Sequence, residues 1–359
     1  MSVTHILSNR TDSFGLGRLA LDEQIAAGVG LCSVVAFAIV FLIEPSLAVF
    51  PVISFLLVTL YGWVRNQAVT ARALTFLATV STIVVLGLIT LFLVFKSTTA
   101  FRIMGLDIVT KTDGTLWSSS DRVFALAPMI WGTFVTTLIA TCIAGPLGIA
   151  GAVFIAEMAP GWVRDIVKPG VEMLAGIPSI VYGFIGFNIV NSAMMDYLGL
   201  TTLGSLFAVG LVIGIMALPT VVSVAEDAIT AVPNAMPDGA LALGVTDWQT
   251  IKSVILPASV SGISAAIILG VGRAIGETMA ATVMLGHNAM FPKPLYNVFG
   301  NTETLTTLIV SQYGNAIADK PYLSALFAAG VVLYITVLAL SIASLLIERR
   351  MESRLGGSL

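Results

Sequence analysis

Two opposite charges, Arg273 and Glu277, stand four residues apart in the otherwise apolar stretch at 258–285. Residues four apart share one face of an α-helix, so their side chains can meet. An unpaired charge is expensive there, roughly 2.5–3.5 kcal/mol for an arginine in the middle of a membrane helix. We therefore expect a mutual ion pair that faces the interior of a helix bundle. Such a pair either holds helices together or marks a functional position, and both interpretations stay open.

A second group of polar residues lies in the apolar stretch at 173–195. Asn188, Asn191 and Ser192 are three and four residues apart, which predicts that they share one helix face. This face is a candidate lining of a polar pathway, and hydrogen bonding between neighbouring helices is the competing interpretation. Ser179 lies about half a turn out of phase and does not extend the face, although it stays among the candidate lining residues.

The sequence lacks the residue patterns of metal sites, catalytic centres, ATP sites and nucleic-acid-binding surfaces. Cys32 and Cys142 are far apart in apolar runs, and His5 and His287 are also isolated, so we expect no metal site and no catalytic centre. No G-x-x-x-x-G-K-[ST] segment occurs, so we expect this chain to have no ATP site and no cofactor of its own. No basic run indicates nucleic-acid binding.

The elements that carry these residues are predicted to be membrane-spanning helices. Of 359 residues, 57% are hydrophobic and 10% are charged, whereas ordinary soluble domains carry roughly 25% charged residues. This composition excludes a water-soluble globule. Runs of roughly 20 apolar residues can cross a bilayer, and they predict an all-α polytopic protein with about eight transmembrane helices. The runs are at 25–43, 46–63, 73–95, 129–156, 173–195, 203–225, 258–285 and 322–347.

Lysine and arginine in the short loops predict the orientation of the helices. They occur in three such places: Arg65 with Arg72, Arg164 with Lys168, and Arg349 with Arg350. Because positively charged short loops stay in the cytoplasm, we expect both termini to be cytoplasmic, with tails at 1–24 and 351–359. The first 24 residues are polar and do not resemble a cleavable signal.

The loop at 226–257 predicts two short helices joined by a turn. Pro237 suits a first helical turn, and Gly244 suits a helix end. Thr246 and Gln249 have the spacing of a capping box, which predicts the start of a second helix. We expect Pro257 to end that helix before the next span.

This loop resembles the coupling loop of ABC importer permeases, whose pattern is E-A-A, three residues, G, nine residues, I-x-L-P. The matching positions are Asp238, Gly239, Ala240, Gly244, Val254, Leu256 and Pro257, with Asp, Gly and Val departing from the pattern. The carboxylate is kept, and Gly239 is expected to cost its helix roughly 0.5–1 kcal/mol relative to alanine. The resemblance implies that the loop docks on a separate ATPase. An interfacial hairpin without a partner is the alternative.

Further segments resemble the PstC-type permeases of bacterial and archaeal phosphate importers. They are LAGIPSIVYGFIG (174–186), AEDAITAVP (225–233), LGVGRAIGETMAATVMLGHN (269–288) and TLTTLIVSQYGNA (304–316). The resemblance covers about residues 75 to 350. We therefore divide the chain into an additional hairpin at 25–72 and an importer permease core at 73–350.

The resemblance implies a multi-pass subunit in the cell membrane of a prokaryote, with phosphate crossing at the depth of Arg273 and Glu277. It also implies a second permease (PstA-like), ATPase subunits (PstB-like) that use the ATP, and an extracytoplasmic phosphate-binding protein (PstS-like). Two alternatives stay open. One is a permease for another oxyanion, molybdate or sulfate. The other is a secondary transporter driven by an ion gradient, which has no need of the loop at 226–257.

Overall fold

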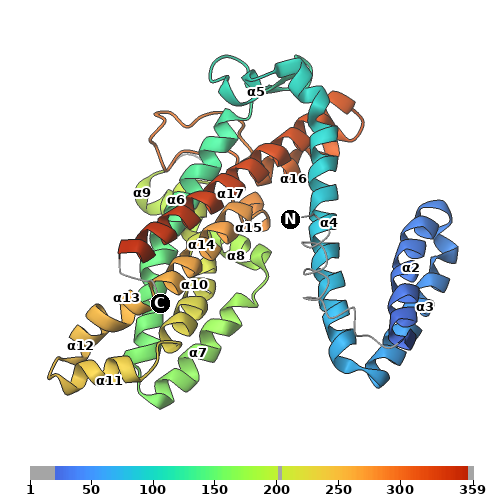
Figure 1. Ribbon diagram of the computed structural model, residues 1–359. Helices are drawn as coiled ribbons and strands as arrows, with labels where there is room; N and C mark the ends of the chain where they lie inside the picture. Colours follow the sequence, from blue (N-terminus) through green and yellow to red (C-terminus); the bar gives the residue numbers. More distant parts are fainter. Residues whose placement is uncertain (1–20, 201–203, 355–359) are drawn as a thin grey trace, which may run out of the picture. The chain divides into compact units, whose positions relative to one another are not determined.

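The computed structural model describes residues 21–200 and 204–354, and these are almost entirely helical (Figure 1). The α-helices are α2 (Leu21–Ile43), α3 (Val49–Arg65), α4 (Gln67–Met104), α5 (Asp107–Thr110), α6 (Ala127–Val153), α7 (Gly161–Ala175), α8 (Ser179–Ile185), α9 (Ser192–Leu198), α10 (Leu206–Thr230), α11 (Ala235–Ala242), α12 (Asp247–Thr250), α13 (Leu256–Ala258), α14 (Val260–Gly276), α15 (Met279–Met284), α16 (Leu305–Ala316) and α17 (Lys320–Arg354). Between them lie a 3₁₀ turn, η3 (Pro45–Ala48), and three π-helical segments, η4 (Phe154–Met158), η5 (Gly186–Asn191) and η6 (Ile251–Ile255). Strands β1 (Trp117–Ser118) and β2 (Val123–Phe124) pair antiparallel.

The all-α polytopic fold expected from the composition is confirmed. Within the described ranges, five helical segments are long and apolar enough to cross a membrane: Pro45–Arg65, Gln67–Met104, Ala127–Met158, Leu206–Thr230 and Lys320–Ile342. The number rises to seven if each of two bent helix pairs is one span, and Gly28–Phe41 is a shorter apolar helix.

Two of the predicted spans are broken rather than continuous. The chain bends by 92° between α7 and α8, and by 71° between α13 and α14. At the first break, Gly176 and Pro178 separate the helices, and proline disfavours a helical residue before it. The predicted run at 173–195 begins before the first bend, and the run at 258–285 is interrupted at Glu277 and Thr278 between α14 and α15, so neither is one straight helix. Local residues mark the first break, whereas contacts described below surround the second.

The chain divides into two compact units, Met1–Ile89 and Thr90–Leu359. In the described part of the first unit, α2 and α3 pack as a hairpin, and Ser33 hydrogen-bonds Ser54 across it at 2.9 Å between hydroxyl oxygens. Apolar side chains such as Leu57 and Leu60 are exposed on this hairpin, as is usual for a surface that faces lipid.

In the second unit, α10 is the central helix and packs against α6 and α14. Small residues make this packing close. A Cβ atom at Gly210 would lie 3.1 Å from the carbonyl oxygen of Thr136 on α6. Backbones of membrane helices approach one another in this way, because lipid offers no hydrophobic drive between helices and close van der Waals contact replaces it.

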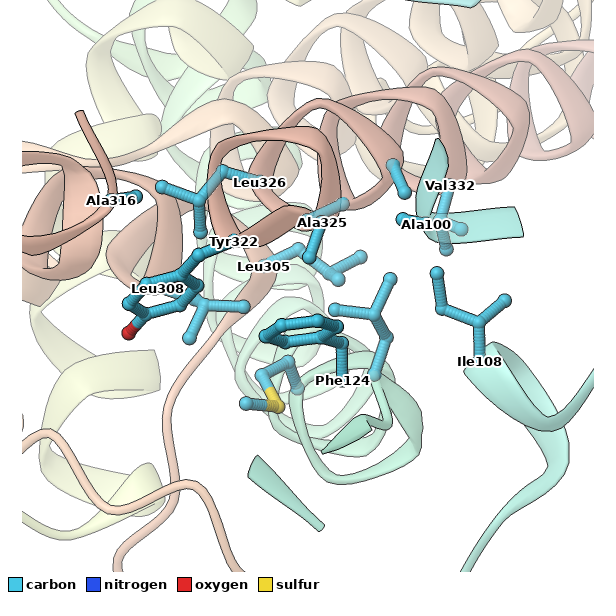
Figure 2. Packing of buried hydrophobic residues seen from close by; sticks show 14 residues of the cluster. Ala100, Ile108, Phe124, Leu305, Leu308, Ala316, Tyr322, Ala325, Leu326 and Val332 are labelled. Atoms are coloured by element: carbon cyan, nitrogen blue, oxygen red, sulfur yellow. The ribbon is translucent and has the colours of Figure 1, made fainter. Parts of the chain in front are cut away.

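An aromatic cluster joins the start of α17 to the short strands (Figure 2). The Phe124 and Tyr322 rings stack at 5.7 Å between centroids, and the Trp117 indole N–H donates to the Tyr322 hydroxyl at 3.2 Å. Leu305 and Leu308 of α16 are buried in the same cluster. The cluster therefore holds α16 against α17 and sets the position of the α16 N-terminus.

Candidate functional site

Arg273 and Glu277 do not lie on one continuous helix. Helix α14 ends at Gly276, Glu277 is extended (φ −68°, ψ 123°), and α15 begins at Met279. The Glu277 carboxylate accepts the backbone N–H of Ala280 at 3.0 Å, so it caps the first turn of α15. The backbone carbonyl oxygen of Glu277 accepts a hydrogen bond from the Thr306 hydroxyl, also at 3.0 Å. The predicted shared helix face is therefore wrong, because a residue from α16 binds the backbone where the helix would have continued.

The expected ion pair between Arg273 and Glu277 is also wrong. Arg273 occupies the last turn of α14 and is half-buried, and none of the ion pairs among the described residues includes it. Its Nε atom is buried without a hydrogen-bond partner. A guanidinium in this condition presents N–H donors and a positive charge to whatever enters its surroundings, and carboxylate and phosphate groups match that fork of donors.

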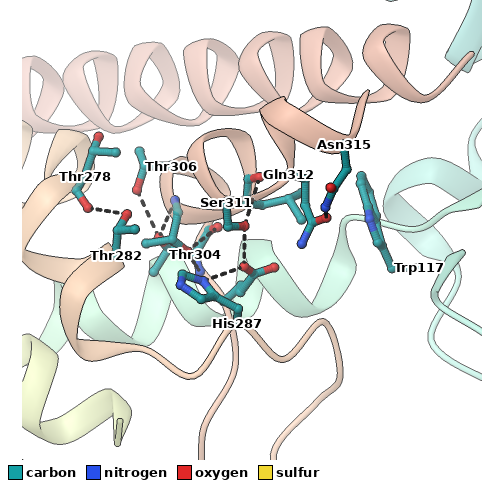
Figure 3. A network of polar contacts seen from close by, with 12 residues as sticks. Trp117, Thr278, Thr282, His287, Thr304, Thr306, Ser311, Gln312 and Asn315 are labelled. Atoms are coloured by element: carbon teal, nitrogen blue, oxygen red, sulfur yellow. Dashed lines mark hydrogen bonds and ion pairs between the residues drawn. The ribbon is translucent and has the colours of Figure 1, made fainter. Parts of the chain in front are cut away.

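The break in α14–α15 faces a hydroxyl-rich turn at the start of α16 (Figure 3). Thr304 and Thr307 form a reciprocal capping box, and all residues from Thr302 to Thr307 are buried. The N–H of Leu305 donates to the hydroxyl of Thr133 on α6 at 2.9 Å. The sequence of this segment resembles the PstC-type permeases but does not by itself indicate a role for these residues. The T-x-x-T spacing was the available signal for a helix start.

His287 is not isolated, contrary to the interpretation of the sequence. Its Nδ1 lies 3.0 Å from Oε1 of Glu303, and the Ser311 hydroxyl donates to the same oxygen at 2.8 Å (Figure 3). Glu303 is fully buried, and its Oε2 has no hydrogen-bond partner. The described residues contain no group of three or more possible metal ligands. The His287–Glu303 pair thus anchors the loop that leads into α16.

The polar residues after α8 do not share one face, because the helix changes its period there. Segment η5 is π-helical, so a spacing of three residues no longer returns to the same side. Asn191 is buried and accepts the N–H of Gly204 at 3.1 Å, whereas Asn188 is exposed and donates to the Phe184 carbonyl at 2.8 Å. Ser179 is half-buried at the first position of α8. Their role as pathway lining stays a prediction.

Helix α8 lies so close to α15 that only glycine fits at their contact. A Cβ atom at Gly183 would lie 2.7 Å from Cα and 2.9 Å from the carbonyl oxygen of Ala280. Real Cβ atoms do not come this close to backbone, so a larger residue must push the two helices apart. Ala280 is also the residue whose N–H binds Glu277. The position of Glu277 therefore depends on this glycine.

Gly183→Ala is expected to destabilise the folded chain by about 1–3 kcal/mol, the usual cost of overpacking. The measurement is the midpoint of thermal unfolding in detergent. Gly272→Ala is the matched control, because a Cβ atom there meets nothing within 4 Å and the position is helical. We expect the control to be neutral or stabilising by up to about 1 kcal/mol. Equal midpoints for Gly183→Ala and the unchanged chain would contradict the close packing.

The loop at 226–257 contains the two predicted helices. Asp238 lies in the first turn of α11, Gly244 has φ +84°, and Thr246 and Gln249 form the capping box of α12, so these predictions are confirmed. The second helix runs through η6 and α13 and ends at Ala258, one residue after Pro257, where the chain bends by 71° into α14, so the predicted end of this helix is also confirmed.

The end of this loop presents apolar side chains to the outside. Leu243 is 86% exposed and Trp248 is 60% exposed. Helix α11 packs against η6 and α12, which brings Asp238, Gly239 and Ala240 into the same small unit as Leu256. An exposed apolar tip on a helical hairpin is typical of a surface that binds another protein.

The family of binding-protein-dependent transport system inner membrane components matches residues 146–354. The probable ABC transporter permease protein YqgH of Bacillus subtilis is 35% identical over 268 residues, which cover 74% of this chain and 84% of that protein. Phosphate transport system permease proteins PstC are 33% identical in Pasteurella multocida (72% of this chain, 84% of that protein) and 33% identical in Mesorhizobium japonicum (79% and 91%).

Two solved structures have a similar fold. A bacterial alginate ABC transporter, in complex with a periplasmic protein that holds an alginate pentasaccharide, gives a TM-score of 0.53 at 19% identity, covering 80% of this chain and 98% of that one. The MetNI methionine ABC transporter in an inward-facing conformation gives 0.51 at 19% identity, covering 65% and 99%. At this identity the similarity concerns the fold alone.

Proposed function

This chain belongs to the family of binding-protein-dependent transport system inner membrane components, and we propose that it carries inorganic phosphate across the membrane as one permease of an ATP-driven importer. The assignment of phosphate as the substrate rests on the similarity to PstC proteins, two of which are 33% identical to this chain over 84% and 91% of their length. The chain is a transporter membrane subunit. The ATP is used by a partner, and no cofactor is assigned to this chain.

The chemistry around Arg273 supports an oxyanion as the substrate. The half-buried guanidinium has an Nε without a hydrogen-bond partner, whereas the hydroxyls of Thr278 and Thr306 at the neighbouring helix break already donate to the carbonyls of Gly276 and Glu277. The guanidinium is therefore the group that can donate hydrogen bonds to a phosphate ion. The carboxylate of Glu277, four residues further on, opposes a tightly held anion and so favours release. These residues are therefore proposed to be the translocation site.

The protonation of phosphate favours it over sulfate or molybdate as the substrate. Near neutral pH phosphate keeps at least one proton, so it can donate a hydrogen bond to a carboxylate such as Glu277, whereas fully ionised sulfate has no proton to donate. A site that contains both a guanidinium and a carboxylate therefore suits a protonated oxyanion. A secondary transporter driven by an ion gradient is not favoured, because both the family and the fold are those of ABC importer permeases.

The family implies an ATPase and a binding protein as partners. We propose that a PstB-like ATPase docks on the exposed tip of the coupling loop, which we define as residues 235–258. A PstA-like permease completes the pathway, and a PstS-like protein delivers phosphate from outside. With both termini in the cytoplasm of a prokaryote, the coupling loop lies on the ATPase side, in agreement with the positive loops.

Uptake measurements test this function. A strain without its own phosphate uptake receives this chain together with its neighbouring permease, ATPase and binding protein, and accumulation of radiolabelled phosphate is measured. We expect uptake that depends on this chain and that a hundredfold excess of sulfate or molybdate leaves unchanged. Competition by either anion at the level of unlabelled phosphate would overturn the substrate, and uptake without ATP hydrolysis would overturn the importer class.

The hairpin of α2 and α3 is predicted to be dispensable for assembly. A chain that starts near Ala68 keeps nearly all of α4, and Arg72 can still orient that helix. We expect this shortened chain to reach the membrane and to co-purify with its partner permease in normal amount. Loss of co-purification, with normal insertion, would show that residues 25–72 belong to the assembly surface.

A further inference from the structure

A buried carboxylate binds two cations at the end of α10 from which the chain leads to the coupling loop. Glu226 lies one turn before the end of α10 and is 1% exposed. Its Oε1 is 2.6 Å from Nη2 of Arg164, and its Oε2 is 2.5 Å from Nζ of Lys168. Both cations belong to α7, so these three residues, the Glu226 cluster, tie α7 to α10. A desolvated carboxylate needs such partners, because an unpaired buried charge is strongly unfavourable.

The two helices joined by this cluster lead to different parts of the molecule. Helix α10 continues through Ala231–Asn234 into α11 of the coupling loop. Helix α7 continues through the 92° bend into α8. Helix α8 packs at Gly183 against Ala280, the residue whose N–H binds Glu277. A path of direct contacts therefore runs from the coupling loop through the Glu226 cluster to the break beside Arg273.

Close packing does not fill the space between α11 and α7. A cavity of about 350 Å³ lies there, lined by residues that include Arg164, Glu157, Asn234, Pro237 and Ile255. Packed side chains transmit displacement because interiors are dense and hardly compressible. The cavity separates α11 from α7, so the coupling loop reaches α7 through α10, which both packs against α7 and is joined to it by the Glu226 cluster.

We infer that Glu226 is a positioning residue that makes α7 follow α10 when the ATPase moves the coupling loop. Without its charge, α7 follows α10 less closely, and ATP hydrolysis displaces α8 and the break at Glu277 less. The inference rests on the proposed function, because it requires an ATPase at the coupling loop. In the sequence, Glu226 is one residue of a segment that resembles the PstC-type permeases, and Arg164 and Lys168 indicate only the orientation of the helices.

The test measures phosphate transported per ATP hydrolysed by the complete importer in lipid vesicles. For Glu226→Gln we expect this ratio to fall about tenfold, equivalent to about 1.4 kcal/mol of coupling free energy. Glu226→Asp keeps the charge and should recover at least half of the ratio. Asp227→Asn is the matched control. It removes a carboxylate that also lies 3.7 Å from Lys168 but is 73% exposed, so it does not tie the two helices together from a buried position. We expect it to match the unchanged importer.

A variant with all three charges removed, Arg164→Gln, Lys168→Gln and Glu226→Gln, separates coupling from folding. It leaves no buried unpaired charge, since Asp227, which also pairs with Lys168, is 73% exposed, so we expect the folded amount to recover while the transport ratio stays low. A normal ratio in this variant would overturn the inference and leave a purely structural cluster. The unchanged importer decides the underlying function by itself, because its failure to transport phosphate concerns the substrate and not the Glu226 cluster.

Discussion

Arg273→Gln is expected to lower phosphate uptake by roughly 10- to 100-fold without lowering the amount of folded chain in the membrane. Hydrogen bonds to a charged group contribute about 1.5–3 kcal/mol, and about 1.4 kcal/mol corresponds to a factor of ten. Folding is spared because Arg273 has no salt-bridge partner in the described structure, so its removal leaves no charge unpaired. Uptake normalised to membrane protein is the measurement.

Arg273→Lys is the matched control for this first prediction. Lysine keeps the charge but loses the planar fork of donors, so uptake should fall to an intermediate level. If Arg273→Gln instead lowers the folded amount and keeps normal uptake per molecule, Arg273 holds helices together and is no part of the pathway.

Two substitutions of Glu277 separate its charge from its capping role. Glu277→Gln keeps an oxygen that can accept the Ala280 N–H, so α15 should stay in place while the charge is lost. Glu277→Leu removes both and should destabilise the start of α15 by about 0.5–2 kcal/mol. Exchanging Arg273 with Glu277 should also misfold α15, because arginine has no acceptor for that N–H. Normal folding of the exchanged variant would contradict the capping role.

Gly244→Val is expected to produce the second large effect, loss of uptake in a chain that still inserts into the membrane. Gly244 has φ +84°, a region that β-branched residues rarely enter, so valine must distort the turn between α11 and α12. A Cβ atom at Gly244 meets nothing within 4 Å, so the effect comes from backbone strain and not from a clash. We expect the ATPase to co-purify about tenfold less, since strain of this kind costs about 1–3 kcal/mol.

Gly244→Asn is the matched control, because asparagine tolerates a positive φ angle. It should retain most of the ATPase binding and uptake. If Gly244→Val binds the ATPase and takes up phosphate normally, the turn is not required for coupling. Gly239→Ala, five residues earlier in a helical position with open space around it, should if anything strengthen α11.

Local sequence signals were sufficient for much of the fold. Runs of apolar residues predicted the membrane helices, since the length of a span follows from bilayer thickness. Within the coupling loop, Asp238 in the first turn of α11, the turn at Gly244 and the capping box of Thr246 and Gln249 were all predicted and found. Each of these features depends on residues within one helical turn of each other, so a short stretch of sequence already contains all the residues that interact.

The tertiary structure decided the features that need partners far along the chain. The helix breaks after Gly276 because Thr306, 29 residues later, binds the Glu277 carbonyl, and this separates Arg273 from its predicted partner. His287 finds Glu303 across 16 residues, and Glu226 finds Lys168 across 58. Apolar periodicity continues through these positions, so nothing in the local pattern predicts them. Composition and short motifs predict an importer permease, whereas hydrogen bonds and ion pairs to residues far along the chain decide that α14 ends at Gly276 and which charges meet.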